Sequence, residues 1–179
     1  MRSLSRWLVL CLALLVVAGL SGCASSANRQ AMTPGDLATT KKFPYSVAVR
    51  TAGGSETGAM DSSNISDQDL QAAIEEAITQ NKLFQRVVQG KDGDYELSVT
   101  IVHLDKPIFG GAFTVDMEAS WALVKVSDRS IVMRKSIKSS HTATFGDALA
   151  AVTRLRLAVE GAARKNIEQG LKDIAALSL

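Results

Sequence analysis

A strict two-residue alternation in the middle of the chain limits the fold more than any other feature of the sequence. The apolar residues Tyr95, Leu97, Val99 and Ile101 alternate with polar ones, and the pattern returns from Phe113 to Leu123. Successive side chains of a β-strand point to opposite faces, so this period indicates strands with one buried and one wet face. The sequence therefore predicts a sheet that is covered on one side only.

Further strands precede and follow these two. Alternation at residues 45–50 predicts a first strand, and the short apolar run at residues 84–88 predicts a second before the Asp92-Gly93-Asp94 turn. A turn at residues 127–130 leads into a last strand, about residues 131–140. Three consecutive antiparallel strands are expected at the end of this series.

Two segments have helical periodicity. Ser66 and Asp69 have capping-box spacing before an apolar stripe, which predicts a helix over residues 67–80. A longer helix is expected over residues 147–177, with an inward stripe that contains Val152, Leu155, Val159, Ala163, Ile167, Gly170, Ile174 and Leu177. On this stripe Gly170 allows close approach to the sheet, whereas Gly161 is predicted on the solvent side.

The order strand, helix, four strands, helix predicts the fold class. Two helices on the apolar face of a mainly antiparallel sheet form a two-layer α+β sandwich. Residues 43–179 are expected to form this single domain.

The N-terminus has the pattern of a bacterial lipoprotein signal peptide. Arg2 and Arg6 precede an apolar run from Trp7 to Leu20, which is too short for a membrane span. The residues Leu20, Ser21, Gly22 and Cys23 that follow look like a lipobox. A plain secretory signal with an incidental cysteine, or an uncleaved anchor, remains an alternative.

If residues 1–22 are removed, Cys23 becomes the first residue and the site of a diacylglyceryl group. The other cysteine, Cys11, is lost with the signal, so no disulfide can form in the mature chain. By resemblance to enterobacterial sorting signals, Ala24 favours the outer membrane over the inner one. Small and polar residues fill positions 23–42, which predicts a flexible tether with a span on the order of 25 Å.

The charge balance argues against one class of partner. Of 179 residues, 157 remain after residue 22, and the loss of Arg2 and Arg6 leaves 18 basic against 18 acidic residues. A chain without excess positive charge has little attraction for nucleic acid. No nucleic-acid partner is expected.

The order of elements resembles small envelope lipoprotein domains related to the N-terminal domain of TolB and to auxiliary lipoproteins of ABC transporters. Residues 142–148 and 154–167 resemble, more narrowly, a group of proteobacterial lipoproteins without an established activity. The lipopolysaccharide-assembly lipoprotein of the outer membrane has a similar order of elements. This chain lacks the Gly-Phe that usually follows the lipidated cysteine in that protein.

Catalytic chemistry is poorly represented. The sequence has none of the nucleophile-elbow, zinc-protease, Cys-x-x-Cys or phosphate-loop motifs. His103 and His141 could hold a metal together with Asp105 or Asp116, but two histidines are a weak ligand set, and no metal and no cofactor is expected. Asp116 and Glu118 share the wet face of one strand, where they are expected to be solvated rather than to act as a glycosidase pair.

Three residues are candidate contacts to a partner or a lipid. Ile108 and Phe109 lie in a glycine-flanked hairpin loop and either fold back over the edge of the core, which we expect, or remain available for binding. Arg156 lies beside the stripe of the long helix, where its aliphatic stem can cover apolar surface while the charge stays in water; an ion pair or a partner contact is the sharper interpretation. Trp121 is expected in the core.

These features predict a non-enzymatic lipoprotein on the periplasmic side of the outer membrane. It is expected to act as an adaptor or accessory subunit of an envelope assembly, with the membrane and an envelope protein as partners. The alternative is an accessory protein that binds or transfers lipid or lipopolysaccharide. Its apolar groove would be lined by Trp121, Met117 and the loop that contains Ile108 and Phe109.

Overall fold

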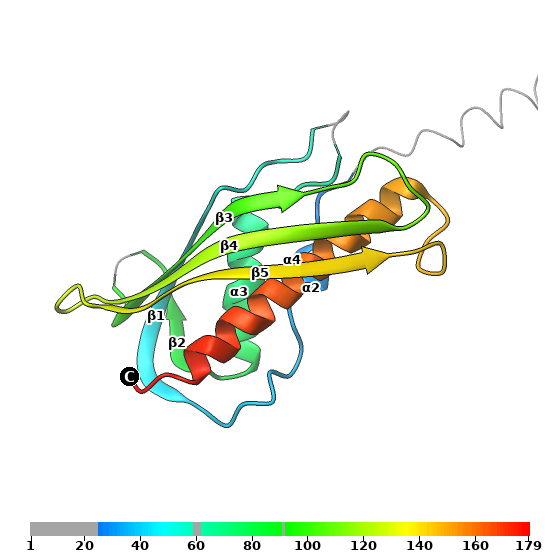
Figure 1. The fold of residues 1–179 in the computed structure, drawn as a ribbon. Helices are drawn as coiled ribbons and strands as arrows, with labels where there is room; N and C mark the ends of the chain where they lie inside the picture. The colour runs from blue at the N-terminus through cyan, green and yellow to red at the C-terminus, as the bar shows by residue number, and fades with distance from the viewer. Residues whose placement is uncertain (1–24, 59–61, 91) are drawn as a thin grey trace, which may run out of the picture.

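A five-stranded sheet with helices on one face forms the domain in the computed structural model (Figure 1). The structure describes residues 25–58, 62–90 and 92–179. In chain order the elements are α2 (Arg29–Met32), β1 (Phe43–Ala52), α3 (Asp67–Gln80), β2 (Phe84–Val88), β3 (Tyr95–Asp105), β4 (Phe113–Lys125), β5 (Ile131–Ala143) and α4 (Ala151–Ala175). The predicted α+β fold and the predicted order from β1 to α4 are confirmed.

The sheet has the strand order β2-β1-β3-β4-β5 and is mixed. Strands β3, β4 and β5 are antiparallel neighbours, as expected, whereas β1 pairs in parallel with both β2 and β3. The crossover through α3 makes the parallel pairing of β1 and β2 possible. Strand β1 is therefore an inner strand, which alternation alone did not reveal.

The core lies between the sheet and the helices. Along β4 the residues at odd positions from Phe113 to Leu123 are buried, so the predicted apolar face of this strand is confirmed. Helix α3 buries the stripe Leu70, Ala73, Ile74, Ala77 and Ile78. The Ser66 hydroxyl accepts a hydrogen bond from the Asp69 N–H at 3.0 Å, which caps this helix as its sequence indicates.

Two glycines bring α4 close to the sheet. A Cβ atom on Gly170 would lie 2.6 Å from the Trp121 ring, so the predicted close approach at Gly170 is confirmed. The solvent-side prediction for Gly161 is wrong, because Gly161 is buried and a Cβ there would lie 2.0 Å from the His141 ring. The packed face of α4 is therefore wider than the predicted stripe. Val159, Ala163, Ile167, Gly170 and Ile174 are buried as predicted, whereas Val152 remains 41% exposed.

The segment before β1 packs on the domain. Ala27, Met32 and Leu37 are buried in the same core as the sheet residues, and the short helix α2 contacts both α3 and α4. The Asn28 side chain caps α2 by accepting the Gln30 N–H at 2.8 Å. The expectation of a flexible tether is thus wrong for residues 27–37, because three apolar side chains provide enough burial to hold a segment of mostly small and polar residues.

Candidate functional site

Five exposed apolar side chains gather at one end of the domain, and we call them the apolar tip. Ile108, Phe109 and Leu149 are 83%, 86% and 87% exposed, and Phe145 and Val152 are 58% and 41% exposed. They belong to the β3–β4 loop, the β5–α4 loop and the first turn of α4 (Figure 1). The expectation that Ile108 and Phe109 fold back over the core is wrong, so both remain candidate binding residues.

Arg154 braces the β5–α4 loop of the apolar tip, and its guanidinium also lies 5.4 Å from the ring centroid of Phe113, the first residue of β4. Its guanidinium lies 3.9 Å from the Phe145 ring centroid and donates to the carbonyl oxygens of Ala148 and Leu149 at 2.9 and 2.6 Å. A Cβ on Gly111 would lie 2.8 Å from the Phe145 ring, which shows how closely the loops meet. Arg154 is only 3% exposed, so the tip has a firm base under its apolar side chains.

The N-terminal segment that begins at Ser25 lies against the base of this tip. Asn64 joins the two segments, because its carbonyl accepts the Ala27 N–H at 3.0 Å and its side chain accepts from Lys106, where the β3–β4 loop begins. Arg156 donates to the Ser25 hydroxyl at 2.8 Å. The N-terminal segment therefore reaches the domain beside the tip.

Arg156 also forms the ion pair that its position in the sequence suggested. Its Nε lies 3.6 Å from Oε1 of Glu160, a side chain that is only 5% exposed. The same carboxylate oxygen accepts the Asn28 N–H at 2.8 Å. Burial raises the pKa of Glu160, although the Asn28 hydrogen bond and the charges of Arg156 and Arg164 oppose the increase. This carboxylate thus fastens the N-terminal segment to α4.

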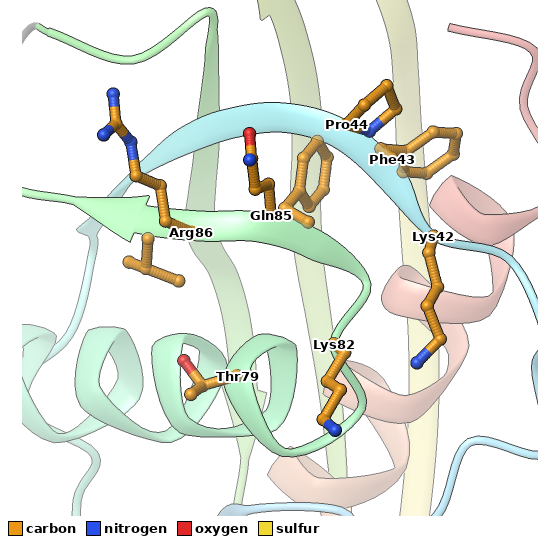
Figure 2. A pocket seen from close by; sticks show the side chains of 9 residues that line it. Lys42, Phe43, Pro44, Thr79, Lys82, Gln85 and Arg86 are labelled. Carbon is orange, nitrogen blue, oxygen red and sulfur yellow. The ribbon is translucent and has the colours of Figure 1, made fainter.

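A second candidate surface is a hollow of about 740 Å³ beside β2, which we call the basic hollow (Figure 2). Its lining is Lys42, Phe43, Pro44, Thr79, Lys82, Phe84, Gln85, Arg86 and Val87. Among the described residues, no carboxylate lies within 4.0 Å of the cationic groups of Lys42, Lys82 or Arg86. The hollow is therefore positively charged over a partly aromatic floor.

The end of α3 places Lys82 at the rim of this hollow. Lys82 adopts the left-handed conformation with φ 52°, its N–H bonds to the Thr79 carbonyl, and the Leu83 N–H bonds to the Ile78 carbonyl. These two bonds form a Schellman cap, which turns the chain sharply from α3 into β2. Since β2 ends the strand order, one of its edges has no strand neighbour in the described part of the chain.

The basic hollow and the apolar tip lie at opposite ends of the sheet. Strand β1 starts at the hollow with Phe43, and four residues later Val47 is level with Tyr95. Strand β3 then runs ten residues in the same direction, from Tyr95 to Asp105, where the loop of the tip begins. Fourteen residue steps of about 3.3 Å separate the two surfaces by about 45 Å along the sheet.

The histidines do not meet. His103 is paired with Glu118 on the open face of the sheet, whereas His141 packs against Gly161 on the helix face. Within residues 25–58, 62–90 and 92–179, no group of three or more His, Cys, Asp or Glu residues could hold a metal ion. The hydrogen bond from the Ser136 hydroxyl lowers the pKa of Glu118, opposite to the change that a general acid needs.

Trp121 and Met117 do not line an open groove. They are 0% and 2% exposed, and the expected core position of Trp121 is confirmed. The Trp121 Nε1–H donates to Asn166 Oδ1 at 2.9 Å. A groove of the predicted composition is therefore not formed by these residues together with Ile108 and Phe109, which lie in the exposed tip.

Sequence reasoning missed Arg154, Glu160 and Asn166, which are polar residues buried along α4. The available signal was Asn166, which interrupts the apolar stripe between Ala163 and Ile167. Leu20, Ser21, Gly22 and Cys23 lie outside the described residues, so the lipobox stays a prediction. Within the described residues, the helices are too short or too polar to cross a membrane.

Comparison with known proteins shows the fold. No protein-family model and no curated protein matches the sequence. A Xanthomonas campestris protein described by the family model DUF330 has a TM-score of 0.60 at 12% identity, over 80% of this chain and 91% of its own. A hypothetical protein from Chlamydia trachomatis gives 0.55 at 5% identity, over 75% of this chain and 97% of its own.

An uncharacterised lipoprotein B from Nitrosomonas europaea has a TM-score of 0.50 at 14% identity, with 78% of this chain and 88% of that one covered. At such low identities these likenesses concern the arrangement of the sheet and helices. The fold is thus one that solved bacterial proteins of undefined activity share, including a lipoprotein.

Proposed function

We propose that this chain is a lipid-anchored lipoprotein of the bacterial envelope that works without catalysis, as an adaptor or accessory subunit facing the periplasm. Its anchor is Cys23, which carries a diacylglyceryl thioether after cleavage behind Gly22. Ala24 favours the outer membrane as its location. The shared fold with an uncharacterised lipoprotein from Nitrosomonas europaea supports this proposal.

The observation that carries the adaptor role is the basic hollow beside the free edge of β2. An extended segment of a partner can pair its backbone with such an edge, and the neighbouring pocket then selects its side chains. Lys42, Lys82 and Arg86 favour acidic side chains, and the rings of Phe43 and Phe84, 5.2 Å apart, belong to the same lining. The partner that fits is a protein with an extended segment of mixed acidic and apolar residues.

Photo-crosslinking in cells tests this surface. A photoreactive amino acid at Gln85, in the hollow, is expected to trap a specific envelope protein. The matched control has the photoreactive amino acid in place of Gln68, which is exposed at the start of α3, and is expected to trap no specific protein. Arg86→Glu, combined with the probe at position 85, is expected to abolish the adduct. Equal adducts at both positions, or none at Gln85, would contradict the adaptor proposal.

The anchor has a separate test. A Cys23→Ser chain is expected to lose its membrane fractionation and to lack the mass of the diacylglyceryl group. If this variant matures normally and stays with the membranes as the unaltered chain does, then the lipid anchor is wrong.

Lipid or lipopolysaccharide binding is the alternative function, and the chemistry of the same hollow favours it. Cations beside an apolar floor also suit an anionic amphiphile. Native mass spectrometry of the purified protein distinguishes the two functions. A non-covalently bound anionic lipid that is lost in Arg86→Glu supports lipid binding. A protein that carries no lipid besides its anchor and has a specific crosslinked partner supports the adaptor.

A further inference from the structure

The apolar tip has almost no charge. From Pro107 to Ala112 the β3–β4 loop contains no ionisable residue, and the β5–α4 loop contains only Asp147 between Ala143 and Thr153. That carboxylate is already engaged, since it accepts the Thr144 N–H at 2.7 Å and the Thr144 hydroxyl at 2.9 Å. The surface thus presents large aliphatic and aromatic side chains with little polar competition.

Ile131, an exposed apolar side chain at the other end of the sheet, has different surroundings. Ile131 is 52% exposed next to the β4–β5 turn, but Asp128, Arg129 and Arg134 lie within three residues of it along the chain. A single apolar residue among charges is ordinary protein surface. The apolar tip is different because five such residues gather on the first turn of α4 and on two loops that meet at Gly111 and Phe145, and a patch of this kind marks an interaction site.

The length of the chain before the domain limits how far the tip lies from the proposed anchor. Only two residue steps separate Cys23 from Ser25, a reach of at most about 7 Å. Ser25 accepts a hydrogen bond from Arg156, which is five residues from the start of α4 and so about 7.5 Å along the helix axis. The two side chains and the hydrogen bond between them span about 12 Å more, so the anchored cysteine is restricted to within roughly 27 Å of the first turn of α4, where the apolar tip lies.

We infer that the apolar tip inserts into the lipid leaflet that carries the Cys23 anchor, an inference that rests on the proposed lipidation. The occupant of this surface is therefore the membrane itself, with Ile108, Phe109 and Leu149 among the acyl chains. The strands extend between the tip and the basic hollow, so the hollow then lies at the end of the sheet away from the membrane, at a height of up to about 45 Å.

Depth-dependent quenching tests this inference with the full-length chain, processed in cells and purified in its lipidated form. A cysteine at Phe109 or at Leu149 is labelled with an environment-sensitive fluorophore. The protein is then placed in vesicles of phosphatidylethanolamine and phosphatidylglycerol, with or without nitroxide-labelled phospholipid. Ile131→Cys is the matched control, because Ile131 is an exposed apolar residue at the start of β5, next to the β4–β5 turn.

Labels at positions 109 and 149 are expected to shift their emission to the blue and to lose most of it to the nitroxide lipid, whereas the label at 131 changes little. The inference is overturned if the protein floats with the vesicles but these labels stay unquenched. That outcome leaves the anchor intact, and a blue shift without quenching would indicate a protein contact at the tip instead.

The unaltered chain distinguishes a tip that is not inserted from a Cys23 that is not lipidated. With Cys11 removed and Cys23 in a thioether, it has no free thiol and is expected to incorporate no dye. Dye incorporation, together with failure to float with the vesicles, would contradict lipidation and with it the inserted tip.

Discussion

The contact between Asn166 and Trp121 gives the sharpest test of how α4 is held on the sheet. Asn166 is fully buried, accepts the Trp121 Nε1–H at 2.9 Å, and donates to the Ile137 carbonyl at 2.9 Å and to the Ser139 hydroxyl at 3.2 Å. This amide therefore joins α4 to both β4 and β5. Arg154 and Arg156 lie in the N-terminal turns of the same helix. The contact that holds α4 on the sheet therefore also supports the apolar tip.

Asn166→Leu keeps the approximate volume of the side chain and removes all three hydrogen bonds. The buried indole N–H then has no acceptor, which costs about 1–3 kcal/mol, and the other two bonds each contribute about 0.5–1.5 kcal/mol. The transfer of a leucine side chain from water to the protein interior is more favourable than that of asparagine, which offsets part of this loss. We expect a decrease in the free energy of unfolding of about 2–4 kcal/mol.

A double-mutant cycle isolates the bond between the two side chains. Trp121→Phe removes the indole donor, so Trp121→Phe with Asn166→Leu leaves neither partner of that bond unpaired. The loss in the double variant is expected to be about 1–2 kcal/mol smaller than the sum of the single losses. Urea unfolding followed by far-ultraviolet circular dichroism measures this, because Trp121 is the only tryptophan after residue 22 and Trp121→Phe removes the fluorescence signal.

Gln169→Leu, at an exposed position of the same helix, is the control and is expected to change stability by less than about 0.5 kcal/mol. Additivity of the two single losses to within about 0.3 kcal/mol would refute the reasoning, because it would mean that the bond has no net energy.

Two further substitutions test α4. Burial raises the pKa of Glu160 above its unfolded value, so the unfolding free energy of the unaltered chain should decline as pH rises from about 4.3 through the higher folded pKa. Glu160→Gln removes this decline, and its stability relative to the unaltered chain should increase with pH in urea titrations; a decrease would contradict the assignment. Gly161→Ala places a Cβ 2.0 Å from the His141 ring and should cost about 1–3 kcal/mol in thermal unfolding. His141→Ala in the same chain should recover most of that loss, and an equal loss without the ring would show that the clash is not the cause.

The sequence predicted most of the elements because each strand and helix has its own periodicity. Alternation identified β3 and β4, and the Ser66 cap identified the start of α3. The parallel neighbours of β1 could not be predicted in the same way, because the period of a strand records which faces are buried and not which strand lies beside it. The pairing depends on long-range contacts that the local pattern does not contain.

The burial of Glu160 on α4 and the order of the N-terminal segment have one physical origin, whereas Gly161 is buried against His141 of β5. The predicted stripe of α4 contains only the residues that a sheet on one side of the helix would cover. In the structure α2 and the residues around it also cover α4, and Asn28 bonds to Glu160 there. Glu160 is therefore buried although its charge indicates solvent, and small polar residues before β1 are ordered although their composition indicates a tether.

This packing changes what an anchored domain of this kind can do. A flexible tether over residues 23–42 would let the domain range over about 25 Å and meet partners at many heights. Because Ala27 and Met32 are buried and Arg156 reaches Ser25, only a few residues separate the domain from Cys23. The conformational entropy of this segment is already lost in the free protein, so it is not lost again when a partner binds. The affinity for the partner is therefore higher without any new contact. In the proposed arrangement the basic hollow stands at one height above the membrane. The domain then selects a partner by the height at which the partner's extended segment lies, as well as by the charge of that segment.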